Sequence, residues 1–201
     1  MEDISDILFG AFEDKFSFIF RDDLDFGRYI FRSNFRAYAT HEDLLRMLVA
    51  VRQSEILGVV DLYFKTSFGI NRSFLSIFIA LWRRSGLLKA IRQALGLLNF
   101  RINPVDKRTA YVSTIGVKPG FQNQKIGEQL MRAAEDMART VGCQHLSLYV
   151  ITRNKRAIHL YSKLGFETLY AMRSSIFAIF NGFYGFLYMK KEIGCEENPS
   201  N

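Results

Sequence analysis

A β-strand, a glycine-bearing turn and a long helix follow one another between Tyr111 and Val141, and this junction constrains the fold most. Residues 110–117 are rich in β-forming side chains, and Lys118-Pro119-Gly120 is a turn signal. The apolar residues that follow share one helix face: Ile126, Leu130, Ala134, Met137 and Val141. Gly142 comes next, where glycine commonly ends helices. Such a junction presents unpaired N–H groups at the positive end of a helix dipole, and it therefore predicts a site for phosphate.

The rest of the chain predicts further helices and strands around one core. With 201 residues, 49% of them apolar and 23% charged, the chain fits a single domain, which we place at 1–194. The tail 195–201 is expected to be disordered. Apolar spacing predicts helices at 3–15, 21–38 and 154–164, and strands at 45–51, 56–64, 110–117, 145–150, 173–179 and 183–190. The first two strands predict one hairpin, and Asn181-Gly182 predicts another between the last two.

The segment 71–100 predicts one or two amphipathic helices, broken near Ser85-Gly86. It combines a long apolar run with interleaved basic residues. Such a segment suits a lid, a dimer contact or a helix lying on an anionic membrane. Packing against the rest of the protein is the favoured interpretation, and membrane contact is the alternative.

The charge of the chain favours an anionic partner. The net charge is +7, and residues 83–125 hold nine Lys and Arg residues against one acidic residue, Asp106. A phosphate-bearing cofactor, nucleic acid and an anionic membrane all fit this charge. Nucleic acid ranks low because no helix-turn-helix or aromatic RNA-binding motif is present.

Two cysteines and three scattered histidines predict neither a disulfide framework nor a metal site. We therefore expect no metal cofactor and a reduced, cytoplasmic setting. The N-terminus lacks the basic region of a signal peptide, and the longest apolar run is too short to span a bilayer.

Two sequence blocks resemble the GNAT superfamily of N-acetyltransferases. The family's acetyl-CoA signature is Val-x-Pro-x-Tyr/Phe followed by Arg/Gln-x-x-Gly-x-Gly/Ala. The chain matches it at Val117, Pro119, Phe121, Gln122 and Gly127. It departs at Lys125, where a glycine is usual.

The second block is similar to the family's Asn-x-x-Ala-x-x-x-Tyr-x-x-x-Gly-Phe. It matches at Asn154, Ala157, Tyr161 and Gly165-Phe166. Both blocks occur in the expected order. The resemblance covers roughly residues 40–191 and is specific over 111–166.

This resemblance implies an α/β (α+β) fold with a mixed, mainly antiparallel twisted sheet flanked by helices. The stretch 71–100 would be a helical insertion. Because helix-like sequence follows Met1 almost directly, the family's first strand is expected to be missing, shortened or supplied elsewhere. An exposed sheet edge would then allow a homodimer.

The resemblance also implies a set of residues that bind acetyl-CoA. Ile115 and Val117 would pair with the pantetheine arm, and Asn154, Ala157 and Tyr161 would border the cofactor. The backbone of the turn would hold the pyrophosphate: Gln122, Asn123, Gln124, Lys125, Ile126 and Gly127. We expect Lys125 to be tolerated, because a helical φ suits lysine and its ammonium group can meet a phosphate.

Tyr161 occupies the position of the family's general acid, which protonates the leaving sulfur; the alternative is a core aromatic residue of the helix. A thiol pKa near ~8.5 and a tyrosine pKa near ~10 make that transfer plausible. For the general base, Ser113 and Thr114 stand where many relatives have a glutamate. Asp61 is the first candidate, with His41 and Glu55 behind it, and a water chain is the alternative.

The sequence thus predicts an acetyltransferase that moves an acetyl group from acetyl-CoA to a primary amine by direct attack in a ternary complex. The acceptor would be a small molecule or a peptide. The alternative is a non-catalytic acyl-CoA-binding or sensing module, with membrane-surface contact through 71–100.

Overall fold

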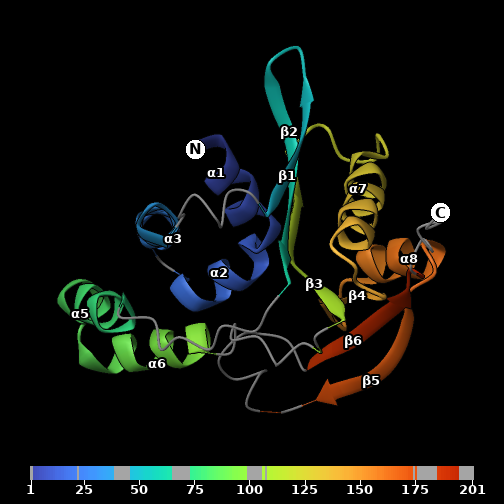
Figure 1. The fold of residues 1–201 in the computed structure, drawn as a ribbon. Helices are drawn as coiled ribbons and strands as arrows, with labels where there is room; N and C mark the ends of the chain where they lie inside the picture. The colour runs from blue at the N-terminus through green and yellow to red at the C-terminus, as the bar shows by residue number, and fades with distance from the viewer. Residues whose placement is uncertain are drawn as a thin grey trace, which may run out of the picture.

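The computed structural model describes residues 2–21, 23–38, 46–64, 73–98, 106, 108–173, 175 and 185–194 (Figure 1). The helices are α1 (Glu2–Ala11), α2 (Glu13–Phe20), α3 (Leu24–Tyr38), α5 (Ser73–Ser85), α6 (Leu87–Leu98), α7 (Ile126–Thr140) and α8 (Lys155–Lys163). The strands are β1 (Met47–Arg52), β2 (Glu55–Tyr63), β3 (Thr109–Val117), β4 (His145–Ile151), β5 (Glu167–Arg173) and β6 (Gly185–Glu192).

The strands form one six-stranded sheet in the order β1-β2-β3-β4-β6-β5. Neighbouring strands are antiparallel except β3 and β4, which are parallel. That parallel pairing joins Thr109–Val112 to His145–Leu148 and then stops, although β3 continues to Val117 and β4 to Ile151. The expected mixed, mainly antiparallel sheet flanked by helices is confirmed.

Helices cover both faces of the sheet (Figure 1). On one face α7 buries Leu130, Met131 and Ala134 in the main core, because its apolar residues lie three or four positions apart. On the other face α1 packs Ile7 and Leu8 against Val59 of β2. Gly116 in β3 permits this contact, since a Cβ atom there would lie 2.8 Å from the carbonyl oxygen of Ile7.

The N-terminal helical region differs from its prediction in one respect. The single helix expected at 3–15 is broken at Phe12, whose φ and ψ are −114° and 11°, so that α1 and α2 are separate. The bend brings the rings of Phe9 and Phe16 into a stacked contact with centroids 4.6 Å apart. Burial of these rings, with Phe31 of α3 at their edges, accounts for the break.

The C-terminal hairpin was only partly predicted. The strand that pairs with β6 is Glu167–Arg173, which lies upstream of the expected strand 173–179. Most of the expected strand 173–179, the expected turn at Asn181-Gly182 and the tail 195–201 lie outside the described residues. The predicted hairpin β1–β2 is confirmed, with Gln53 and Ser54 at positive φ of 49° and 68° in its turn.

The amphipathic helices predicted within 71–100 are also confirmed, as α5 and α6, which are separated at Gly86 with a φ of 78°. Leu81, Ala90 and Ala94 from these helices are buried in one cluster with Phe16 and Phe20 of α2. The favoured interpretation, packing on the protein, is therefore correct for this inner face. Of the helices that the structure describes, none is long and apolar enough to cross a bilayer.

Candidate functional site

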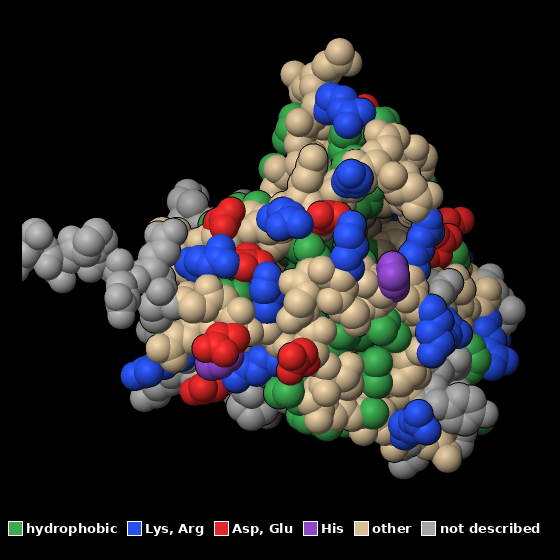
Figure 2. All heavy atoms as spheres, turned by 90° about the vertical axis from the view of Figure 1, so that its right-hand side faces the viewer, with side chains coloured by type: hydrophobic (Ala, Val, Ile, Leu, Met, Phe, Trp, Pro, Cys, Tyr) green, Lys and Arg blue, Asp and Glu red, His purple; other side chains and the backbone are tan. Residues whose placement is uncertain are grey.

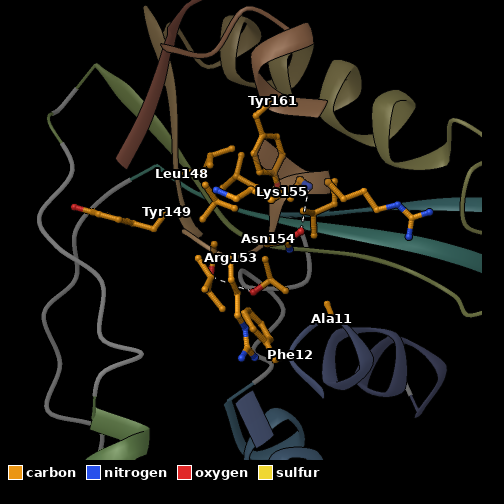
Figure 3. A pocket seen from close by; sticks show the side chains of 16 residues that line it. Ala11, Phe12, Leu148, Tyr149, Arg153, Asn154, Lys155 and Tyr161 are labelled. Carbon is orange, nitrogen blue, oxygen red and sulfur yellow. Dashed lines mark hydrogen bonds between the residues drawn. The ribbon is translucent and has the colours of Figure 1, made fainter. Parts of the chain in front are cut away.

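A cavity of about 520 Å³ opens where β3 and β4 separate. Its walls come from the diverging strands, the N-terminal half of α8 and the bend between α1 and α2 (Figure 3). The lining residues are Ala11, Phe12, Val112, Ser113, Thr114, Ile115, Leu148, Tyr149, Val150, Ile151, Arg153, Asn154, Lys155, Arg156, Ala157 and Tyr161. Beyond Val112 and Leu148 the two strand edges face this space, so an extended ligand can pair with backbone there.

The N-terminus of α8 brings basic side chains to the cavity. Asn154 caps the helix, and its side-chain oxygen accepts a hydrogen bond of 3.1 Å from the N–H of Ala157. Arg153, Lys155 and Arg156 surround this cap, and the first turn contains no acidic residue. Because cations are unfavourable at the positive end of a helix dipole, this arrangement indicates an anionic ligand.

The N-terminus of α7 provides a second set of donors. The first backbone hydrogen bond of the helix runs from the N–H of Gln129 to the oxygen of Lys125 at 3.0 Å. The N–H groups of Ile126, Gly127 and Glu128 come before this bond and have no acceptor within the helix. The side chain of Lys125 does not cap them. A Cβ atom at Gly127 would lie 3.7 Å from Leu160, which is ordinary contact. Packing therefore does not require this glycine, whereas close approach of a phosphate would.

Side chains from both ends of α8 link this helix to the start of α7. Arg156 of α8 donates to the side-chain oxygen of Asn123 in the turn before α7. Lys163 of α8 forms an ion pair of 3.3 Å with Glu128 of α7, which also pairs with Arg132. Figure 2 shows Lys and Arg side chains gathered on the face that carries these helices, bordering a hollow.

The expectation for the backbone of Lys125 was wrong. Lys125 has φ 63° and ψ 8°, which is the left-handed region and not the helical one. The turn must reverse direction between β3 and α7, and Asn123 also has a positive φ, 66°. This geometry explains why a glycine is usual at the position, since a Cβ atom is strained there. The substitution therefore leaves the turn in place at a conformational cost.

Tyr161 lies in the cavity wall and in the core. It projects from α8 toward the cavity (Figure 3), and its ring centroid lies 5.9 Å from that of Phe166. Only 7% of its surface is exposed, and this burial raises the pKa of the phenol to about 12. The phenol is therefore protonated at neutral pH. The tyrosine pKa near ~10 expected from the sequence is that of an exposed phenol. Burial limits contact with water and raises the pKa of Tyr161 above that value.

Asp61 is buried one strand away from the cavity. It lies on β2 opposite Thr114 of β3, and Thr114 lines the cavity whereas Asp61 does not. Burial raises the pKa of Asp61 to about 7, against the opposing effects of the Arg46 charge and of hydrogen bonds from Leu62 and Tyr63. A carboxyl group with this pKa exchanges a proton readily near neutral pH.

The other base candidates are not in the cavity wall. Glu55 pairs with Lys118 near the tip of the β1–β2 hairpin. His41 lies outside the described residues. Within the described ranges, no group of three His, Cys, Asp or Glu side chains gathers that could hold a metal.

The structure gathers part of the predicted set in one cavity: Ile115, Asn154, Ala157 and Tyr161. Val117 packs against the main core and Ile126 is buried in it, while Gln122, Asn123, Gln124 and Lys125 are exposed in the turn.

Sequence reasoning missed Phe12, Tyr149, Arg153 and Arg156. The two arginines carried a readable signal, because they flank a helix cap where basic residues are unfavourable. Phe12 and Tyr149 reach the cavity through packing of distant segments and carried no such signal.

Comparisons with known proteins bear on the family and the fold of the chain. The family model described as "Acetyltransferase (GNAT) family" matches residues 2–166. The thialysine N-epsilon-acetyltransferase of Bos taurus is 36% identical over 74 residues, which are 37% of this chain and 44% of the relative. The chain thus spans less than half the length of this curated relative.

Solved structures share the fold at low sequence identity. A crystal structure of an acetyltransferase aligns with a TM-score of 0.58 at 18% identity, over 96% of this chain and 94% of that one. The yncA protein of Salmonella typhimurium, solved with its cofactor acetyl-CoA, aligns with a TM-score of 0.52 at 16% identity, over 85% and 78% of the two chains. From its family-model match and its fold, we conclude that this chain belongs to the GNAT acetyltransferase family.

Proposed function

We propose that this protein is an N-acetyltransferase that transfers an acetyl group from acetyl-CoA to a primary amine by direct attack in a ternary complex. The observation that carries this proposal is the cavity between β3 and β4, which has Tyr161 in its wall and the basic N-terminus of α8 at its edge. The name of the bovine relative supports an amine acceptor. A cytoplasmic location and a homodimer stay predictions.

Acetyl-CoA fits the groups that surround the cavity. Its phosphates would accept hydrogen bonds from the N–H groups of Ile126 and Gly127, and they would pair with the positive charges of Arg156 and Lys125. Its pantetheine arm would lie along β3 at Ile115 and Val117, beside Asn154 and Ala157. When bound, acetyl-CoA supplies a thioester carbonyl that an amine can attack.

Tyr161 would act as the general acid. Its phenol carries a proton at neutral pH, and burial raises its pKa further above neutrality, to about 12. The same exclusion of water raises the pKa of a thiol held beside it, so the leaving sulfur becomes a better proton acceptor there. We assign to Tyr161 the donation of the proton to that sulfur.

Asp61 would accept the proton that the amine loses. Its pKa of about 7 leaves a useful fraction ionised at neutral pH. Since Asp61 does not line the cavity, the proton would reach it past Thr114, through the hydroxyl group or a water molecule. The rate should then fall as the pH drops below about 7.

The substitution Tyr161→Phe tests the proposal. We expect acetylation of an amine panel to fall by about 10²-fold or more, while calorimetry shows CoA binding unchanged, because the variant removes only the phenolic hydroxyl group. Tyr29→Phe is the matched control, since Tyr29 lies on α3 and is 63% exposed.

Two results would count against the proposal. A Tyr161→Phe enzyme with the wild-type rate would make Tyr161 a core aromatic residue only. A wild-type protein that binds CoA but turns over no amine in the panel would support the non-catalytic acyl-CoA-binding module.

A further inference from the structure

The helical hairpin α5–α6 exposes an apolar surface on the side away from the protein. Six large apolar residues are each between 37% and 84% exposed: Ile79, Trp82, Leu87, Leu88, Ile91 and Leu95. We call this set the outer face of the hairpin. An exposed apolar surface of this kind marks an interaction site more often than isolated apolar residues do.

Helical spacing gathers these residues on one side. Ile79 and Trp82 are three positions apart on α5, and Leu88, Ile91 and Leu95 follow the same repeat on α6. The opposite side is already filled, because Leu81, Ala90 and Ala94 are buried against α2. The hairpin is therefore apolar on both sides, although one side suffices for folding.

The charges that the hairpin itself carries are all positive. The stretch Ser73–Leu98 contains four basic residues and no Asp or Glu. Two of the four are held by the protein: Arg84 pairs with Asp23 at 2.9 Å, and Arg92 donates to the carbonyl oxygen of Ile19 at 2.9 Å. Arg83 and Lys89 are exposed, and each lies next to an apolar residue of the outer face.

The combination of exposed apolar residues and positive charges favours one kind of partner over another. A second copy packed face to face would set one positively charged hairpin against another, and like charges oppose such a contact. A surface of anionic lipid headgroups complements these charges and accepts the apolar side chains below them. Trp82 suits the boundary between headgroups and acyl chains.

We propose that the outer face of α5–α6 binds an anionic lipid surface, with both helices lying in the plane of the membrane. The hairpin lies apart from α7 and α8 (Figure 1), and none of the residues that line the cavity between β3 and β4 comes from α5 or α6. This inference does not depend on the proposed acetyl transfer.

Co-sedimentation of the full chain with vesicles tests the proposal. We expect pelleting with phosphatidylcholine vesicles that contain phosphatidylglycerol, and little with phosphatidylcholine alone. Binding should weaken at high salt, because the attraction of Arg83 and Lys89 is screened.

The variant Leu88→Glu should weaken vesicle binding by about tenfold or more, because it removes an apolar contact and adds a repelled charge. Leu88 is 84% exposed, so folding should be unaffected; an unchanged melting temperature and unchanged CoA binding check this. Val141→Glu is the matched control, since Val141 is 57% exposed beyond the end of α7, and it should bind vesicles like the wild type.

Three results would overturn the proposal. The first is no lipid-dependent pelleting of the wild type. The second is equal loss of binding in Leu88→Glu and Val141→Glu. The third is a wild-type dimer in analytical ultracentrifugation that Leu88→Glu dissociates, because the outer face would then bind a second copy of the chain.

Discussion

Lys125 offers a direct test of how the turn before α7 is built. Its φ of 63° places a residue with a Cβ atom in the left-handed region, at the N-cap of the helix. For residues other than glycine this conformation costs about 1–2 kcal/mol. Replacement by glycine removes that cost, but it also gives the unfolded chain more freedom, which costs about 0.5–1 kcal/mol. We therefore expect Lys125→Gly to stabilise the protein by about 0.5–1 kcal/mol.

Thermal unfolding can detect this change. A domain of this size shifts its melting temperature by about 2–4 °C for each kcal/mol, so the expected rise for Lys125→Gly is about 1–4 °C. Lys125→Ala is the matched control, because alanine keeps the Cβ atom and its strain while it removes the ammonium group. Lys125→Ala should melt within about 1 °C of the wild type.

The same pair of variants separates the backbone from the charge in CoA binding. If the ammonium group meets a phosphate at this exposed position, both variants should bind CoA about two- to fivefold more weakly by calorimetry. The difference between them reports the backbone alone. Equal melting temperatures for Lys125→Ala and Lys125→Gly would refute the argument that the positive φ carries a cost.

Two further variants test the buried carboxyl and the helix N-terminus. Burial raises the pKa of Asp61 from 3.8 to about 7, so the folded state holds this proton more tightly than the unfolded chain. The resulting stabilisation is complete below about pH 4 and is lost as the pH rises through about 7. Asp61→Asn should therefore be more stable than the wild type by up to about 4 kcal/mol near pH 8, with no comparable gain near pH 4, in urea unfolding. Gly127→Ala should melt at or above the wild-type temperature, because the new methyl group makes only an ordinary contact with Leu160 at 3.7 Å. The same variant should bind CoA about tenfold more weakly in calorimetry. Unchanged CoA binding would mean that no phosphate approaches this turn.

Local sequence patterns predicted those parts of the fold that local forces determine. Helix α7 was predicted because its apolar residues share one face, and Gly142 ends it at a φ of 83°. The break between α5 and α6 was likewise predicted from Gly86, whose φ is positive. Strand β5 was not predicted because almost all of its residues are exposed, so no apolar alternation distinguishes it. Its position depends on pairing with β6, which is a contact between distant residues.

The site was predictable to the extent that sequence motifs carry it. Asn154, Ala157 and Tyr161 were assigned from a resemblance, and they line one cavity. The φ of Lys125 was not predictable from its own neighbours, because the distance between β3 and α7 sets the turn geometry. The pKa values of Tyr161 and Asp61 depend on burial by segments far away in the chain, so sequence alone could not give them.

The separation of β3 from β4 has a consequence for how ligand and fold are coupled. Within the described residues, the ladder between the half-sheet β1-β2-β3 and the half-sheet β4-β6-β5 consists of four residue pairs, from Thr109–His145 to Val112–Leu148, extended by main-chain hydrogen bonds from Gln144 and His145 to Arg108. A ligand lying between the diverging ends of β3 and β4 would hydrogen-bond to strands of both halves and extend this short pairing. Occupancy and folding would then be linked by mass action, worth about 2.7 kcal/mol at a ligand concentration of 100 Kd. A higher concentration of this ligand would then lower the fraction of the protein that is unfolded.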